Sequence, residues 1–286
     1  MRPTIAALLR WMTFLTCLLA VTPVLYGADL TAEDVLSKHL ASIGAPEMRN
    51  AKTRIAQGTV LYKILVGGSG QADGKAVFVS DGAKRQIMMK IDDRNYRGEQ
   101  WIFNGEKCSV SFSLSQQRRS QIGEFLYYQD APQREGLLGG LLTTSWPLFD
   151  LAAHDAKVVY KGLKKMDGRD LHDVLYQSRK NGDYEIHLYF DPETFRHVMT
   201  VYNISVQPQL RFSGDTRNAR QTPERHRIEE RFSQFKQFDG LMLPTHYDLQ
   251  YTQELQTGGT SLFEYEITIN QVGNNEGVDA RNFDLR

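Results

Sequence analysis

The chain has 286 residues, with 34 basic and 34 acidic side chains and therefore a formal net charge of zero at pH 7. This balance lacks the concentrated basic excess of a nucleic-acid-binding protein, so no nucleic acid is expected as a partner. The length allows one β-rich domain with a sizeable core. After residue 27 the sequence contains one cysteine, Cys108, which excludes an internal disulfide there.

The N-terminus has the features of a secretory signal peptide over residues 1–27. Arg2 and Arg10 provide a positive flank, and an uncharged apolar run follows. A small residue before the cut is typical of such signals, which predicts cleavage near Gly27–Ala28. We therefore expect a protein exported to the periplasm, with residues 28–286 forming a single domain.

Two other interpretations of the N-terminus stay open, an uncleaved membrane anchor and lipidation at Cys17. The apolar run from Trp11 to Val21 is well short of the roughly 20 residues of a membrane-spanning helix. A lipidated cysteine normally follows a small residue at the end of the apolar run. Here Thr16 precedes Cys17 and the run continues beyond it, so cleavage is favoured.

A first helix is predicted over residues 31–43. Thr31 can cap its N-terminus, and Asp34 completes a capping box. Gly44 and Pro46 end it. Its apolar-leaning residues recur at helical spacing and indicate one buried stripe. They are Val35, Leu36, His39, Leu40 and Ile43.

The next part of the chain predicts a meander of five strands. Its segments are rich in β-branched and aromatic residues and are separated by short turns such as Asn104–Gly105. Consecutive strands joined by short turns pair antiparallel. The predicted strands cover residues 54–66, 77–79, 85–91, 101–103 and 107–112.

The segment 115–153 interrupts this pattern. Residues 121–128 predict a helix, and an apolar, glycine-rich stretch follows at 136–149. Its leucines repeat at helical spacing, but each glycine weakens a helix by up to about 1 kcal/mol relative to alanine. Two interpretations stay open: a lid over an apolar pocket, or a core helix that packs closely at the glycines. The leucines are Leu137, Leu138, Leu141 and Leu142.

Strands then resume to the end of the chain, and the whole pattern predicts about 12 strands. We expect a mainly β (α+β) fold, in which one large antiparallel sheet curves into an unclosed β-barrel with helices packed on its concave face. An apolar pocket would lie between the two layers. The later strands are predicted at residues 157–163, 171–178, 184–190, 197–204, 228–238, 243–252 and 261–269.

No motif indicates catalysis, a metal or a cofactor. The histidines form no His-Glu-x-x-His pair, and the closest cluster of possible ligands surrounds a predicted hairpin turn, which explains it without a metal. A Gly-x-Ser-x-Gly motif is absent as well. We therefore expect a protein that is not an enzyme, with no catalytic residues, metal site or cofactor. The cluster consists of Asp167, Asp170, His172 and Asp173.

Several segments together resemble the LolA/LolB-like superfamily of periplasmic lipoprotein carriers and its broad group of uncharacterised exported relatives. The resemblance implies an unclosed β-barrel whose helices plug the concave face, and it implies binding of acyl chains rather than catalysis. It also implies a buried arginine that regulates opening, for which Arg54 and Arg85 are candidates. The segments are Leu40–Asn50 leading into Ile55–Thr59, Leu188–Thr194, Phe238–Pro244, Ile267–Asn270 and Asn282–Leu285.

The leading hypothesis is a monomeric periplasmic carrier for a lipid or for lipoprotein acyl chains. The alternative is a periplasmic sensor or regulatory module that binds a lipid or an envelope membrane protein. A third hypothesis, an exported hydrolase, would need a nucleophile such as Ser111. The residues expected to line the pocket are Val60, Tyr62, Ile64, Val77, Val79, Trp101 and Phe103, and those expected in the lid are Leu137, Leu138, Leu141, Leu142 and Trp146.

Overall fold

The computed structural model describes residues 30–112, 118–180, 182–206, 223–255 and 258–285. Within these residues, no helix is both long and apolar enough to cross a membrane. The predicted signal peptide and its cleavage site lie outside the described part of the chain.

Strands dominate the described structure, as the alternating pattern predicts. They are β1 (Thr53–Val66), β2 (Gly70–Asp81), β3 (Lys84–Ile91), β4 (Gly98–Phe103), β5 (Cys108–Phe112), β6 (Ala156–Met166), β7 (Arg169–Ser178), β8 (Glu185–Phe190), β9 (His197–Val206), β10 (Glu224–Phe238), β11 (Leu241–Glu254) and β12 (Thr260–Asn274).

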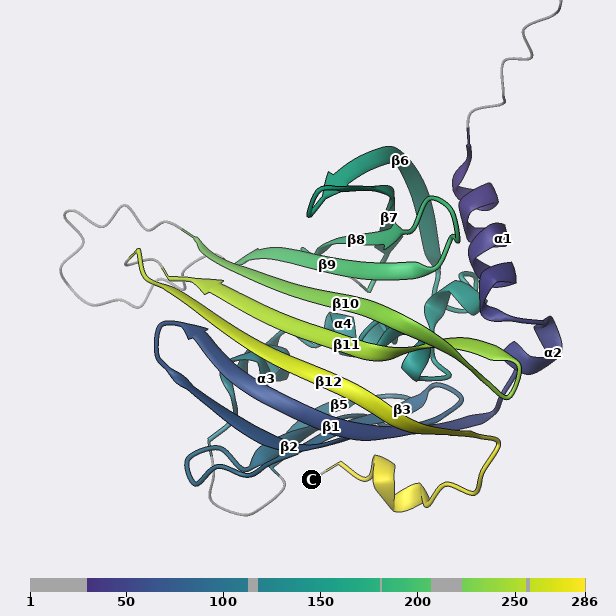
Figure 1. Cartoon of the computed structure of the whole chain (residues 1–286). Coiled ribbons are helices and arrows are strands. Elements are labelled where there is room, and N and C mark those ends of the chain that lie inside the picture. Colours follow the sequence, from purple (N-terminus) through teal and green to yellow (C-terminus); the bar gives the residue numbers. More distant parts are fainter. Residues whose placement is uncertain (1–29, 113–117, 181, 207–222, 256–257, 286) are drawn as a thin grey trace, which may run out of the picture.

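All of these strands pair antiparallel in one sheet, in the order β5-β4-β3-β2-β1-β12-β11-β10-β9-β8-β7-β6. Among the described strands, β1 and β12 are the only paired neighbours that are not consecutive in the chain. Because β5 and β6 lie at opposite edges and do not pair, the sheet curls without closing (Figure 1). The predicted mainly β, unclosed barrel is confirmed.

The helices are short, and three of them pack on strands of the sheet. The predicted capping box of the first helix is present, since Thr31 N donates to Asp34 and Asp34 N donates to Thr31 Oγ1. That helix contacts β11 and β6, whereas α3 packs on β5 and α4 on β4. The helices are α1 (Ala32–Ile43), α2 (Pro46–Arg49), α3 (Gln121–Tyr128) and α4 (Ala131–Glu135), with 3-10 turns η1 (Gly140–Leu142), η2 (Pro147–Phe149) and η3 (Ala280–Phe283).

The connection from β5 to β6 crosses the molecule from one edge of the sheet to the other. It contains α3, α4, η1 and η2 in that order. On the way η1 contacts both β1 and β11, which lie near the middle of the sheet. The connection therefore covers the concave face and completes the core.

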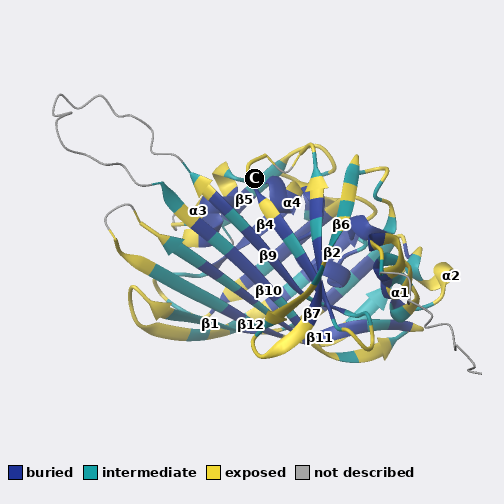
Figure 2. Cartoon of the chain, turned by 90° about the horizontal axis from the view of Figure 1, so that it is seen from above, coloured by how far each residue is buried: buried dark blue, intermediate teal, exposed yellow. Residues whose placement is uncertain are grey.

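One continuous core fills the space between the concave face and this connection. In β12, for example, Tyr265 and Ile267 are fully buried, whereas Glu266 between them points outward. Figure 2 shows the same alternation of buried and more exposed residues along the central strands. A strand that buries one face of a sheet has this period of two.

The predicted orientation of β2 is wrong by one residue. Ala76 and Phe78 belong to the core on the concave face, and Phe78 pairs with Ile87 of β3. Val77 and Val79 therefore point to the convex face, because successive side chains of a strand alternate in direction. The run Val77–Phe78–Val79 is apolar on both faces, so its sequence gives no polar residue by which to choose between them.

A glycine of α3 tests how tightly the connection packs on the sheet. A Cβ at Gly123 would lie 2.3 and 2.4 Å from the carboxylate oxygens of Glu99, which also accepts hydrogen bonds from Ser120 N and Oγ. We expect Gly123→Ala to lower the free energy of unfolding by about 1–3 kcal/mol, measured by denaturant titration. Gly277→Ala is the control, since its Cβ would meet nothing within 4 Å. Equal stability of the two variants would contradict this packing.

Candidate functional site

The candidate site is the contact between the concave face and residues 136–149, here called the plug. The sequence leaves open a helix or a lid, and the helical expectation is wrong, because the plug contains only two short 3-10 turns. Gly136, Gly139 and Gly140 have φ angles of 82°, 80° and 48°, which interrupt an α-helix. A Cβ at Gly140 would lie 2.9 Å from the ring of Phe232. The plug is thus an irregular chain pressed closely onto the sheet.

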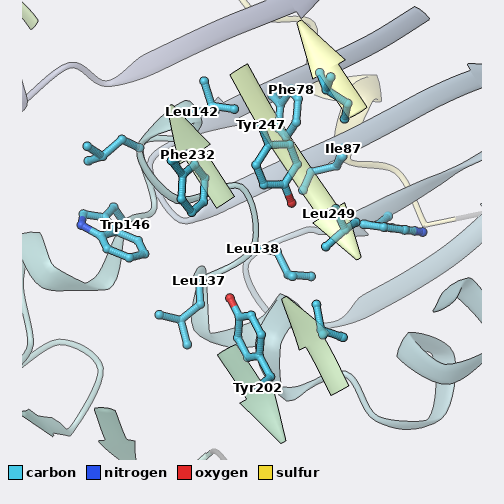
Figure 3. Close-up of a cluster of buried hydrophobic side chains, with 14 of the residues drawn as sticks. Phe78, Ile87, Leu137, Leu138, Leu142, Trp146, Tyr202, Phe232, Tyr247 and Leu249 are labelled. Carbon is cyan, nitrogen blue, oxygen red and sulfur yellow. The ribbon is translucent and has the colours of Figure 1, made fainter. Parts of the chain in front are cut away.

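The apolar side chains of the plug are buried in the main core. They meet side chains that rise from the sheet strands on several sides, as the close-up in Figure 3 shows. The contacting sheet residues include Phe78, Ile87, Tyr202, Phe232, Tyr247 and Leu249. The plug occupies the place where the sequence predicts an apolar pocket.

Arg54 of β1 binds the plug backbone. Its guanidinium donates to the carbonyl oxygens of Leu141 and Thr143, and its Nε donates to Asn274 at 2.8 Å. The side chain is only 1% exposed, and burial lowers the pKa of Arg54 to about 10, so it remains charged at pH 7. The next strand adds a further contact, because Thr144 N donates to Ser80 Oγ at 2.9 Å.

Glu230 of β10 binds the other end of this backbone segment. Its carboxylate accepts hydrogen bonds from Gly139 N at 2.7 Å, from Tyr247 OH at 2.7 Å and from Tyr202 OH at 2.5 Å. The side chain is fully buried, and desolvation raises the pKa of Glu230 to about 7 despite these donors. Two buried ionisable side chains, a basic one and an acidic one, therefore hold the plug from different strands.

Trp146 ties the plug to α1. Its Nε1 donates to His39 Nε2 at 3.2 Å, and His39 Nδ1 donates to the carbonyl of Phe195, which defines a neutral imidazole. Burial lowers the pKa of His39 to about 4 and favours this neutral form. The ring centroid of His197 lies 4.7 Å from that of Trp146. Desolvation lowers the pKa of His197 as well.

The structure brings most of the predicted pocket residues into one core. Phe103 is buried beside Arg85, and Tyr62 packs against the core with partial exposure. Ile64 lies on the same face but is half-exposed near the end of β1, and Val77 and Val79 face the opposite side. The residues inside the core are Val60, Trp101, Leu137, Leu138, Leu141, Leu142 and Trp146.

Sequence reasoning missed two kinds of site residue. The first is the aromatic lining from the later strands, although the alternation of Tyr247, Leu249 and Tyr251 in β11 could have indicated it. The second is the pair of charged contacts to the plug. Arg54 appears only as one of two candidates for a regulatory arginine, and Glu230 has no local signal.

The residues considered for a metal site or for hydrolysis form no such site among the described residues. Among the described residues, no three His, Cys, Asp or Glu side chains come together to hold a metal. His172 instead bonds to Tyr160 OH at 2.9 Å, and Asp173 pairs with His187. Ser111 Oγ is buried without a hydrogen-bond partner, so no base lies beside it among the residues described.

Glu230 gives a testable pH dependence. Because its pKa is raised in the folded state, the protonated form favours folding, and stability falls as pH rises from about 4.5 to about 7. We expect Glu230→Gln to remove up to about 3 kcal/mol of this fall, measured as the unfolding free energy of wild type minus variant between pH 4 and 8. The buried histidines have lowered pKa values and so make stability rise with pH, but they are present in both proteins. Their contribution cancels in the difference, which therefore reports on Glu230 alone.

Glu193→Gln, on an exposed turn, is the control for removing a surface carboxylate. Parallel stability curves for wild type and Glu230→Gln over that pH range would contradict the assignment.

Comparison with known proteins found no matching family model and no matching curated protein. Solved structures do match. A LolA superfamily protein from Nitrosomonas europaea is 16% identical with a TM-score of 0.45, and the match covers 89% of this chain and 97% of that one. A putative outer membrane lipoprotein-sorting protein domain from Vibrio parahaemolyticus is 12% identical with a TM-score of 0.44, covering 88% and 95%.

A DUF1329 family protein from Desulfovibrio piger is 10% identical with a TM-score of 0.40, and the match covers 88% of this chain and 96% of that one. The first two of these structures are a LolA superfamily protein and a lipoprotein-sorting domain, the group that the sequence segments resemble. Similarity at this level concerns the fold alone, so the functional argument rests on the geometry of the plug.

Proposed function

We propose that this protein is an exported periplasmic carrier that binds an apolar ligand, a lipid or a lipoprotein acyl chain, in place of the plug and without catalysis. The observation that carries the proposal is the plug itself. An irregular, glycine-rich segment fills the apolar concave face and is held there largely by side-chain hydrogen bonds from the sheet.

The sheet does not need the plug for its strand pairing. Every strand from β1 to β12 has its ladder partners within the sheet, and the plug contributes no strand. Withdrawal of the plug therefore costs packing and a few hydrogen bonds but leaves the ladder intact. A segment of this kind can exchange with a ligand while the domain stays folded.

An acyl chain can replace the contacts that the plug makes. Each methylene taken out of water contributes about 0.8 kcal/mol, so a long chain recovers the burial lost when the leucines leave. Replacing the buried leucines of the plug by an acyl chain therefore has a small net free energy. Small net energies suit a carrier, which must release its ligand as well as bind it.

The buried polar contacts give the closed state a defined geometry. When the plug leaves, Arg54 loses the carbonyls of Leu141 and Thr143, and Glu230 loses Gly139 N. A buried group without its partner costs about 1–3 kcal/mol. These contacts therefore hold an empty carrier closed.

The first experiment is native mass spectrometry of the mature protein, expressed in a periplasm and purified without detergent. A discrete added mass that organic extraction removes as lipid supports the carrier and identifies its cargo. A stoichiometric membrane protein recovered instead would favour the sensor hypothesis.

A disulfide between the plug and β2 tests whether the plug is the gate. The 2.9 Å bond from Thr144 N to Ser80 Oγ brings the two backbones within disulfide range. We expect oxidised Ser80→Cys/Thr144→Cys, made in a Cys108→Ser background, to bind the neutral fluorophore N-phenyl-1-naphthylamine at least about tenfold more weakly than its reduced form.

Ser80→Cys/Cys108→Ser is the matched control, because it has the same lost hydroxyl and cannot form the bridge. Equal binding by the oxidised and reduced double-cysteine proteins would show that the ligand does not replace the plug.

A further inference from the structure

Arg85 lies beside the plug on the concave face. It pairs across strands with Ser80 of β2 on one side and with Phe103 of β4 on the other. Ser80 in turn pairs with Arg54 of β1. The two buried arginines are therefore in one row across the sheet, separated by a single serine.

The guanidinium of Arg85 is only partly satisfied. Its Nη1 donates to the carbonyl of Ala83 at 2.9 Å, and its Cζ lies 4.5 Å from the ring centroid of Phe103. The side chain is 2% exposed, yet Nε and Nη2 are buried with no hydrogen-bond partner among the residues that the structure describes. These two nitrogens form one edge of the guanidinium, with parallel N–H bonds that match two oxygens of a carboxylate or phosphate.

No described carboxylate forms an ion pair with this guanidinium. The charge of Glu135 acts on Arg85 and partly offsets the effect of burial on the pKa of Arg85, but the two side chains form no ion pair. One oxygen of Glu135 accepts from Tyr176 OH at 2.9 Å, and the other has no hydrogen-bond partner. Arg54 differs, because its donors are used by the plug and by Asn274. A buried cation with a free donor edge is costly to a protein and is therefore a signature of a binding role.

The free edge lies close to the place where the ligand would enter. Ile87 is two residues from Arg85 on the same face of β3, about 7 Å along the strand. A Cβ at Gly139 of the plug would lie 3.6 Å from Ile87 Cδ1. A chain that replaces the plug over Ile87 thus places its end within reach of Arg85.

We propose that Arg85 binds the anionic head group of the apolar ligand through Nε and Nη2, and that the ligand is an amphiphile with a terminal carboxylate or phosphate. This inference rests on the proposed carrier function. The acyl chain takes the place of the plug leucines, and the head group supplies the two acceptors that the closed protein lacks.

The test is displacement of N-phenyl-1-naphthylamine by hexadecanoate, methyl hexadecanoate and hexadecyl phosphate, with wild type and Arg85→Met. We expect wild type to bind at least one anion about tenfold or more tightly than the ester, as a charge-assisted bidentate contact implies. Arg85→Met should lose this preference and bind the ester as wild type does. The anion that shows the larger preference identifies the head group.

The melting temperature separates a binding arginine from a structural one. Arg85→Met removes a buried charge that forms no ion pair with the described carboxylates, so the ligand-free variant should melt at or above the wild-type temperature. Ile87→Ala, which shortens a side chain on the proposed chain-binding surface and leaves the Phe103 ring in place, is the control and should weaken all three ligands equally. If Arg85→Met does not fold, Arg85→Lys keeps the charge without the bidentate edge and should show a reduced preference for the anion.

Equal affinities of wild type for the ester and both anions, or an anion preference that survives in the folded substitution variant, would overturn the assignment of Arg85 and leave the carrier function standing. Failure of every ligand, and of the fluorophore, to bind wild type would overturn the carrier function and this inference with it.

Discussion

The pairing of β1 with β12 is the constraint on which the rest of the structure depends. It joins two meanders, β1 to β5 and β6 to β12, back to back in one sheet, and so sends β5 and β6 to opposite edges. The chain between those edges has to cross the curved sheet. By crossing on the concave side it becomes the second layer of the core, and no separate element is needed to cover the apolar face.

This arrangement explains why the plug is both buried and irregular. A regular helix would hold its backbone away from the sheet by the length of its side chains, whereas Gly139 and Gly140 let the backbone approach Phe78 and Phe232 directly. Close approach leaves the carbonyl and amide groups of the plug without helical partners. Arg54, Ser80 and Glu230 supply those partners from three strands, which couples the closure of the plug to buried charge.

The buried ionisable side chains differ in how many of their hydrogen-bonding atoms have partners. Glu230 has three donors, and the donors of Arg54 reach the plug backbone and Asn274. Arg85, one strand beyond Ser80, keeps two donors free in the same apolar layer. Burying these donors without acceptors is costly, and the proposed anionic ligand would supply the acceptors.

The sequence by itself determined the first helix, the fold class and the order of the strands, although it predicted β2 only at residues 77–79 and the strand covers Gly70–Asp81. Alternating side chains and turn residues are local signals, and the strands after Asp155 follow them closely. It did not determine which face of β2 is inside, because Val77, Phe78 and Val79 are all apolar. Nor did it determine the conformation of the plug. Four leucines at helical spacing predict a helix there, but the glycines between them adopt positive φ angles and pack closely, which prevents it.

Only the tertiary structure decided the polar contacts of the site. Arg54 and Leu141 are 87 positions apart in the chain, and Gly139 and Glu230 are 91 apart. No local pattern links residues at such separations, because their contact follows from the strand order and the crossing of the sheet. The same holds for Arg85: its sequence shows an arginine in a strand, and only the packed fold shows that the charge is buried with one edge free.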